Sequence, residues 1–182
     1  MPFYKCHKDK DWYYYLFEPN PLSFKEIAKQ IKEYNIPNLT LLEYAAWHEE
    51  CRREMWLSIR KNRNGGYKKR GGASLFSGKR LLGKVREAVD CIDFDKWVKK
   101  NLSKEDYIHL RMDIEGAEYY VLPKMIKGGS MDYISSLSIE FHAYKFKGEN
   151  RKIFNLIHKE LKEYFSNCKN IEILKLQGIE KN

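Results

Sequence analysis

The stretch RMDIEGAEYYVLPKMI, residues 111–126, decides the fold class of this 182-residue chain. It continues an alternating segment, 107–114, in which every second residue is apolar, so we expect a β-strand there. Beyond Gly116 the apolar residues follow helical spacing up to the glycine pair at 128–129, which predicts a helix, although Pro123 disfavours it outside the first turn. A strand that leads into a helix in this way is typical of an α/β fold.

The rest of the chain repeats this alternation of strands and helices. Asp93 is a suitable N-cap for one of the helices. The segment 62–80, which contains glycine pairs at 65–66 and 71–72, predicts a loop. The remaining pattern predicts strands over 12–17, 39–44, 51–60, 89–92, 132–144 and 171–177, and helices over 22–34, from 93 onward, and over 151–165.

Composition indicates one globular domain spanning residues 1–182, since 43% of the residues are hydrophobic. The cysteines Cys6, Cys51, Cys91 and Cys168 are widely spaced, which favours reduced thiols over a zinc site. No stretch approaches the roughly 20 apolar residues of a membrane span, and the N-terminus is too polar for a signal peptide. The sequence therefore predicts a soluble, cytoplasmic protein.

The positive charge of the chain is concentrated in one segment. Net charge is +9, but the ten Lys and Arg residues between Met55 and Arg86 face no acidic residue in that interval. This basic segment, centred on 60–86, is either a solvated loop or a docking surface for nucleic acid or a phosphorylated partner. It is not a phosphate-binding P-loop, because the spacing from Gly72 to Gly78 and the residue after Lys79 do not match that motif.

Acidic residues follow three of the predicted strands: Glu18, Asp113 and Glu140. In open α/β sheets, ligands bind at the carboxyl ends of strands, so these residues are candidates for one site. Glu140 and His142 alternate along their strand, and both are expected to point toward Asp113. Asp113, Glu140 and His142 would form either a site for a divalent metal or an acid/base group that deprotonates a hydroxyl.

Each of these residues also has a purely structural interpretation. Glu115 and Glu118 lie close to the start of a predicted helix, where a negative charge is stabilising by about 0.3–1 kcal/mol. Glu118 is the member of the group that we expect to be structural, and Asp113 the one that we expect to be functional.

Three segments, YLFEPNP (15–21), MDIEGAEYYVLPKMI (112–126) and YISSLSIEFH (133–142), together resemble the FkbM-type S-adenosylmethionine-dependent methyltransferases. The resemblance covers roughly residues 12–145. It implies a Rossmann-like class I methyltransferase sheet with helices on both faces. It also implies transfer of a methyl group to a hydroxyl of a saccharide, a lipid-linked sugar or another small molecule.

The resemblance assigns roles to residues of this chain. Glu18 would bind the ribose hydroxyls of S-adenosylmethionine, and Glu43 and Ala45 would lie near the adenine. Asp113 and His142, with Glu140 beside them, would serve the methyl transfer, with one of them as the base. A divalent metal is a separate hypothesis that the resemblance does not require.

The chain departs from the family pattern at its N-terminus. Members of the family begin with a strand and a Gly-rich turn that lies against the cofactor, whereas residues 1–11 contain no glycine. A longer gene, a decayed or split chain, or a substitute strand over 2–6 would each account for this. We therefore expect weak or no cofactor binding. The alternative function is a non-catalytic module that binds nucleic acid or a phosphorylated partner through 60–86.

Overall fold

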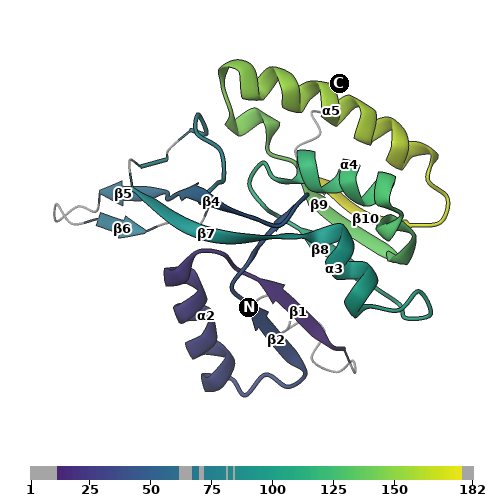
Figure 1. Ribbon diagram of the computed structural model, residues 1–182, viewed down its shortest axis with the longest axis horizontal. Coiled ribbons are helices and arrows are strands. Elements are labelled where there is room, and N and C mark those ends of the chain that lie inside the picture. The colour runs from purple at the N-terminus through teal and green to yellow at the C-terminus, as the bar shows by residue number, and fades with distance from the viewer. Residues whose placement is uncertain (1–11, 62–66, 70–71, 81, 84, 178–182) are drawn as a thin grey trace.

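A computed structural model describes residues 12–61, 67–69, 72–80, 82–83 and 85–177 of the chain. They form a mixed α/β structure, as the sequence predicts (Figure 1). Its helices and strands, in chain order, are β1 (Tyr14–Phe17), α2 (Pro21–Glu33), β2 (Leu39–Leu42), β3 (Ala45–Trp47), β4 (Cys51–Trp56), β5 (Ile59–Lys61), β6 (Tyr67–Lys69), β7 (Arg86–Asp93), α3 (Phe94–Asn101), β8 (His109–Met112), α4 (Glu118–Gly128), β9 (Ser136–Glu140), α5 (Gly148–Asn167) and β10 (Glu172–Gln177). Short 3₁₀ helices, η1 (Ser130–Tyr133) and η2 (Ala143–Lys145), flank β9.

Two groups of parallel strands carry the strand ends that the sequence singled out. Strands β10, β9 and β8 form one sheet in that order, with Met112 of β8 opposite Ile139 of β9. Strands β1 and β2 form a separate parallel pair, connected through α2. This connectivity follows from the alternation of strands and helices in the sequence, because parallel neighbours need a crossover between them.

The expected single doubly wound sheet is not formed by the described residues. Within them, no backbone ladder joins β1 to β8, and the two groups form separate sheets. Side chains connect the two groups instead. Phe17 of β1 contacts the rings of Phe94 and Trp97 in α3, with centroid separations of 5.4 and 4.9 Å.

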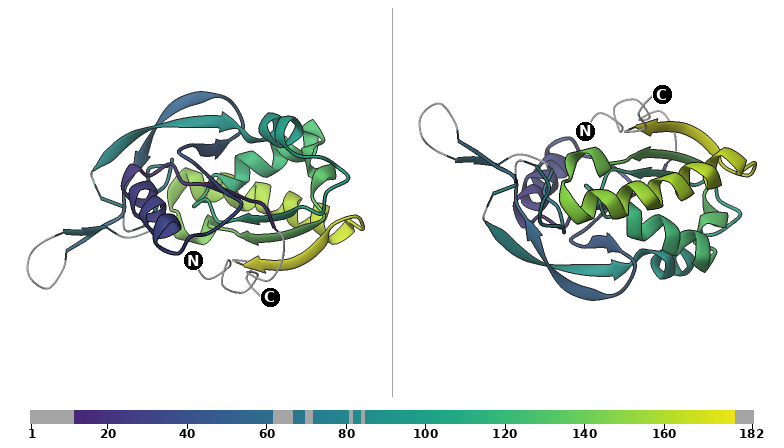
Figure 2. Two further views of the ribbon diagram at one scale, coloured as in Figure 1. Left: turned by 90° about the horizontal axis from the view of Figure 1, so that it is seen from below. Right: turned by 90° about the horizontal axis from the view of Figure 1, so that it is seen from above.

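A third sheet, in the order β3–β7–β4, lies between these groups in sequence and extends away from them toward the β5–β6 hairpin (Figures 1 and 2). The prediction of a loop over 62–80 is wrong in part, because Tyr67–Lys69 pairs antiparallel with Ile59–Lys61. Strand β7 is also longer than the predicted 89–92, because all six residues of β4 pair with it. The lengths of these strands are determined by pairing with distant residues, which local patterns do not report.

The main core lies between the β8–β9–β10 sheet and the helices α4 and α5, which cover the same face of it (Figures 1 and 2). Leu122 of α4, Leu137 of β9 and Phe154 of α5 are almost completely buried in it. No helix in the described part of the chain combines the length and apolar character needed to span a membrane.

Helix α4 contains Pro123 in its interior, where the sequence alone disfavoured a helix. Proline removes one intrahelical hydrogen bond, but Val121, Leu122 and Met125 each bury their side chains nearly completely in the core. This packing outweighs the local cost. The helix ends as predicted, at Gly129 in the left-handed conformation with a φ of 84°.

Candidate functional site

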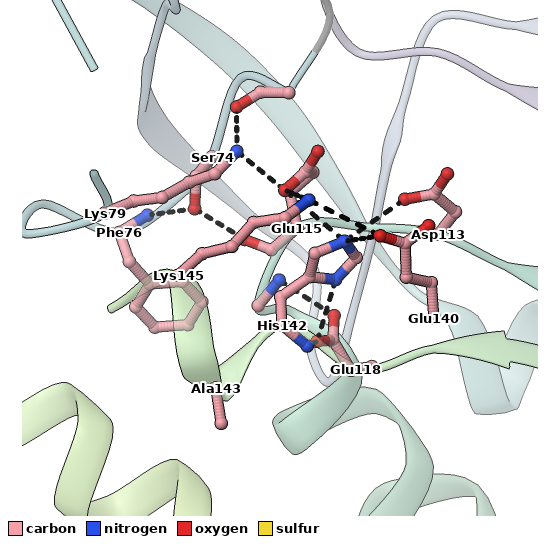
Figure 3. A network of polar contacts seen from close by, with 12 residues as sticks. Ser74, Phe76, Lys79, Asp113, Glu115, Glu118, Glu140, His142, Ala143 and Lys145 are labelled. Carbon is pink, nitrogen blue, oxygen red and sulfur yellow. Dashed lines mark hydrogen bonds and ion pairs between the residues drawn. The ribbon is translucent and has the colours of Figure 1, made fainter. Parts of the chain in front are cut away.

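The carboxyl ends of β8 and β9 bring the predicted acidic residues together. Because Met112 pairs with Ile139, Asp113 and Glu140 follow at neighbouring positions of the same sheet edge. His142 comes two residues after Glu140, just before η2. Figure 3 shows the side chains of Asp113, Glu115 and Glu140 directed toward the ring of His142. We refer to Asp113, Glu115, Glu118 and Glu140, together with His142, as the carboxylate cluster.

Glu118 fixes the position of the histidine ring. Both residues are fully buried, and Nδ1 of His142 lies 3.1 Å from Oε1 of Glu118. The same carboxylate accepts hydrogen bonds from the backbone N–H groups of His142 and Gly116, each at 2.8 Å. A carboxylate that accepts only from N–H groups leaves the proton on Nδ1 of the ring. Glu118 is thus a positioning residue for the ring of His142.

The other ring nitrogen faces the remaining carboxylates. Nε2 of His142 lies 3.4 Å from Asp113 Oδ1, 3.5 Å from Glu115 Oε2 and 3.3 Å from Glu140 Oε1. It is buried and has no hydrogen-bond partner in the described structure. One atom each from Asp113, Glu115 and His142 lie within 4.8 Å of one another, which suits the binding of a metal ion.

Two lysines enter the cluster from outside the sheet edge. Nζ of Lys79 lies 2.6 Å from Glu115 Oε2 and also donates to the carbonyl of Gly72. Nζ of Lys145 lies 3.2 Å from Glu115 Oε2 and 3.5 Å from Glu140 Oε1. Sequence patterns indicated neither lysine as part of the site and placed Lys79 in the basic segment. No local signal marks Lys79, because its partner Glu115 is brought to it only by the tertiary fold.

These contacts determine how the groups ionise. Burial raises the pKa of Asp113, and the neighbouring Glu140 carboxylate adds to this effect. Burial would also raise the pKa of Glu115, but the hydrogen bond and the charge of Lys79 hold it below its usual value. Burial lowers the pKa of Lys79, and Glu115 only partly offsets this. Glu115 is therefore held in its ionised form by the lysines, whereas Asp113 is the carboxylate that accepts a proton more readily.

The turn between β8 and α4 requires its glycine. Glu115 adopts a left-handed φ of 56°, and its carbonyl accepts a 2.7 Å hydrogen bond from the hydroxyl of Ser74. Gly116 follows with a φ of 109°, and a Cβ at this position would lie 2.7 Å from the ring of Phe146. Only glycine is compatible with that contact, so the turn aims the Glu115 side chain at the lysines.

A pocket of about 270 Å³ adjoins the cluster. Its walls come from segments that are far apart in the sequence: the residues after β1, the start of β3, the loop 72–75 and the turn after β8. Glu18, Ala45, Asp113 and Glu115 are among its lining residues. A second hollow of about 160 Å³ lies along β8 and β9 and shares Asp113 with the first. Asp113 thus stands where the two hollows meet, and 44% of its side chain is exposed.

A family model described as Methyltransferase FkbM domain matches residues 2–171, nearly the whole chain. The chain belongs to the FkbM methyltransferase family. No curated protein and no solved structure matches it. The resemblance that the sequence suggested is thereby confirmed.

The three residues of this FkbM-family chain that the resemblance placed at the cofactor are not equivalent in the structure. Glu18 and Ala45 line the large pocket, whereas Glu43 is exposed and does not line it. One carboxylate oxygen of Glu18 accepts a 2.9 Å hydrogen bond from the backbone of Asn20. Burial raises the pKa of Glu18 in spite of this bond. The strand predicted over 39–44 in fact ends at Leu42, which turns Glu43 toward solvent.

The basic segment of this family member lies largely outside the described residues, or in strands whose side chains are not described. Three of its members are described. Lys79 is buried against Glu115, Arg80 is exposed, and Arg86 pairs with Glu54 at 2.7 Å. The prediction of a binding surface for nucleic acid stays a prediction. The neighbouring residues 72–75 border the large pocket.

Proposed function

We propose that this chain is an S-adenosylmethionine-dependent O-methyltransferase, with a hydroxyl of a saccharide, a lipid-linked sugar or another small molecule as acceptor. Membership of the FkbM methyltransferase family supports the reaction class. The observation that carries the proposal is the large pocket, where Glu18 from the end of β1 and Asp113 from the end of β8 line the same space. In this proposal, β1–β2 and β8–β9–β10 are the two parts of a Rossmann-like methyltransferase site.

The residues of the pocket suit the cofactor in kind. Glu18 offers a carboxylate that can accept hydrogen bonds from a pair of ribose hydroxyls. Ala45, Met55 and Leu75 supply an apolar wall for a planar base. The pocket volume of about 270 Å³ is close to the lower end of the range for small-molecule sites, which is about 300–1,000 Å³.

Bound S-adenosylmethionine supplies an electrophilic methyl group, and the protein supplies position and a proton acceptor. We assign the proton acceptor to Asp113, because its half-exposed carboxylate lines the pocket. The acceptor oxygen would form a bond to the methyl carbon while the methyl–sulfur bond breaks, and the hydroxyl proton would pass to Asp113. Positioned bases of this kind contribute about 100- to 10,000-fold to rate.

Calorimetric titration of S-adenosylhomocysteine into the 182-residue chain tests this function. We expect binding weaker than micromolar, because residues 1–11 contain no Gly-rich turn. Glu18→Ala should abolish the binding, whereas Glu43→Ala, an exposed carboxylate outside the pocket, should leave it unchanged. No heat of binding with the folded wild-type chain, or equal loss in both variants, would contradict the proposal. A micromolar or tighter dissociation constant would contradict the expected weakness but support the site.

A further inference from the structure

We propose that the carboxylate cluster binds a divalent cation at Nε2 of His142, with oxygen ligands from Asp113, Glu115 and Glu140. An acidic cluster alone would not carry this inference, because carboxylates often gather without an ion. The observation that does so is Nε2 of His142, a fully buried ring nitrogen without a hydrogen bond that points into the cluster.

The protonation of the ring supports a cation at this place. Glu118 accepts from Nδ1, so in a neutral ring Nε2 carries a lone pair and no proton. That lone pair faces three carboxylates at 3.3–3.5 Å, an unfavourable arrangement unless a positive charge lies between them. A carboxylate that orients a histidine from behind, as Glu118 does, is the usual outer partner of a metal-bound imidazole.

The distances also suit an ion better than a directed hydrogen bond. The three oxygens are almost equally far from Nε2, at 3.3, 3.4 and 3.5 Å, and none meets the geometry of a hydrogen bond. Neighbouring ligands of an octahedral ion with bonds of about 2.1–2.4 Å are separated by about 3.0–3.4 Å. The separations of the three oxygens from Nε2 are thus close to those of neighbouring metal ligands.

The charge of the cluster points the same way. Four carboxylates face two lysine side chains, which leaves a net charge of −2 when His142 is neutral. A divalent cation balances this charge. The half-exposed carboxylate of Asp113, between the two hollows, gives the ion a path of entry. Oxygen ligands with one imidazole suit Mn²⁺ or Mg²⁺ better than a softer metal.

This site does not depend on methyl transfer, since an ion can bind without cofactor or acceptor. The contact of Asp113 with Nε2 is made by Oδ1. A cation bound there would make this carboxylate a weaker base. A cation beside that carboxylate would also lower the pKa of an acceptor hydroxyl.

The test is a titration of MnCl₂ into the metal-free chain, followed by the electron paramagnetic resonance signal of free Mn²⁺. We expect one ion per chain and at least about 10-fold weaker binding in Asp113→Asn and in Glu140→Gln. The matched variants Asp132→Asn and Glu149→Gln replace exposed carboxylates elsewhere and should bind as the wild type does. Near-ultraviolet circular dichroism verifies that each variant is folded.

A second readout ties the ion to the histidine. Bound Mn²⁺ should selectively broaden the nuclear magnetic resonance signals of the His142 ring. No binding by the folded wild type, or binding that both cluster variants retain, overturns the proposal and indicates that a proton on His142 balances the cluster instead. Binding of Mn²⁺ without binding of S-adenosylhomocysteine would keep the cation site and refute the cofactor proposal, and the reverse result would do the opposite.

Discussion

The units β1–α2–β2 and β8–α4–β9 have the same connectivity and each places a carboxylate after its first strand, but they are packed very differently. Helix α4 buries Leu122 and Met125 completely in the main core, whereas α2 has no buried residue. Glu118 of the second unit accepts hydrogen bonds from several N–H groups, whereas Glu18 accepts one from Asn20. The strand–helix–strand pattern therefore fixes connectivity without fixing packing density, and the polar chemistry gathers on the rigid unit.

The largest expected difference between the two units concerns buried leucines. Leu137→Ala in β9 should lower the free energy of unfolding by about 2–5 kcal/mol, because it leaves a cavity in the main core. Leu41→Ala in β2 removes the same atoms from a half-buried position and should cost about 1 kcal/mol. Urea denaturation followed by tryptophan fluorescence measures both. Equal losses would show that the β1–α2–β2 unit is packed as firmly as the other.

A smaller difference in the free energy of unfolding is expected between substitutions of Glu118 and of Glu18. Glu118→Gln turns an NH₂ group toward backbone and ring N–H groups that have no other acceptor, and should cost about 1.5–3 kcal/mol. Glu18→Gln retains an oxygen for the single bond from Asn20 and should cost less than about 1 kcal/mol. The same denaturation experiment compares them, and a reversed order would refute the view that Glu118 is the structural member of the pair.

The smallest difference is expected between the cap of α2 and the cap of α3, the helix that precedes the second unit and contacts α4. Asp93 caps α3 through the N–H of Lys96 and also lies 3.7 Å from Lys124, so Asp93→Ala should cost about 1–2 kcal/mol. Asn20 caps α2 through the N–H of Leu22 alone, and Asn20→Ala should cost about 0.5–1 kcal/mol. Thermal unfolding of both variants at one pH resolves the difference. A larger loss for Asn20→Ala would mean that α2 contributes more to stability than its exposure indicates.

Sequence patterns predicted the fold where local chemistry decides it. The strands β1 and β8, the cap at Asp93 and the end of α4 at Gly129 all follow from alternation, capping and glycine signals. The hairpin β5–β6, the length of β7 and the separation of the parallel strands into two sheets depend on pairing between distant residues. Local patterns contain no information on such pairing.

The candidate site was predictable to the same degree. Asp113, Glu140 and His142 come together because two neighbouring parallel strands end there, which the alternation indicated. Lys79 and Lys145 could not be found in this way, because the contact of Lys79 with Glu115 joins residues 36 positions apart, and that of Lys145 joins residues 30 apart. The exposure of Glu43 depends on where β2 ends, and strand ends are the least certain part of any sequence pattern.

The close approach of Gly116 to Phe146 links the candidate site to the stability of the core. Phe146 is almost completely buried, and a Cβ at position 116 would lie 2.7 Å from its ring. Because a packed interior has little room to yield, any side chain at position 116 must displace either the buried ring or the turn that carries Glu115. Function and folding are therefore constrained together at this one position, and no substitution there can change the site and leave the core intact.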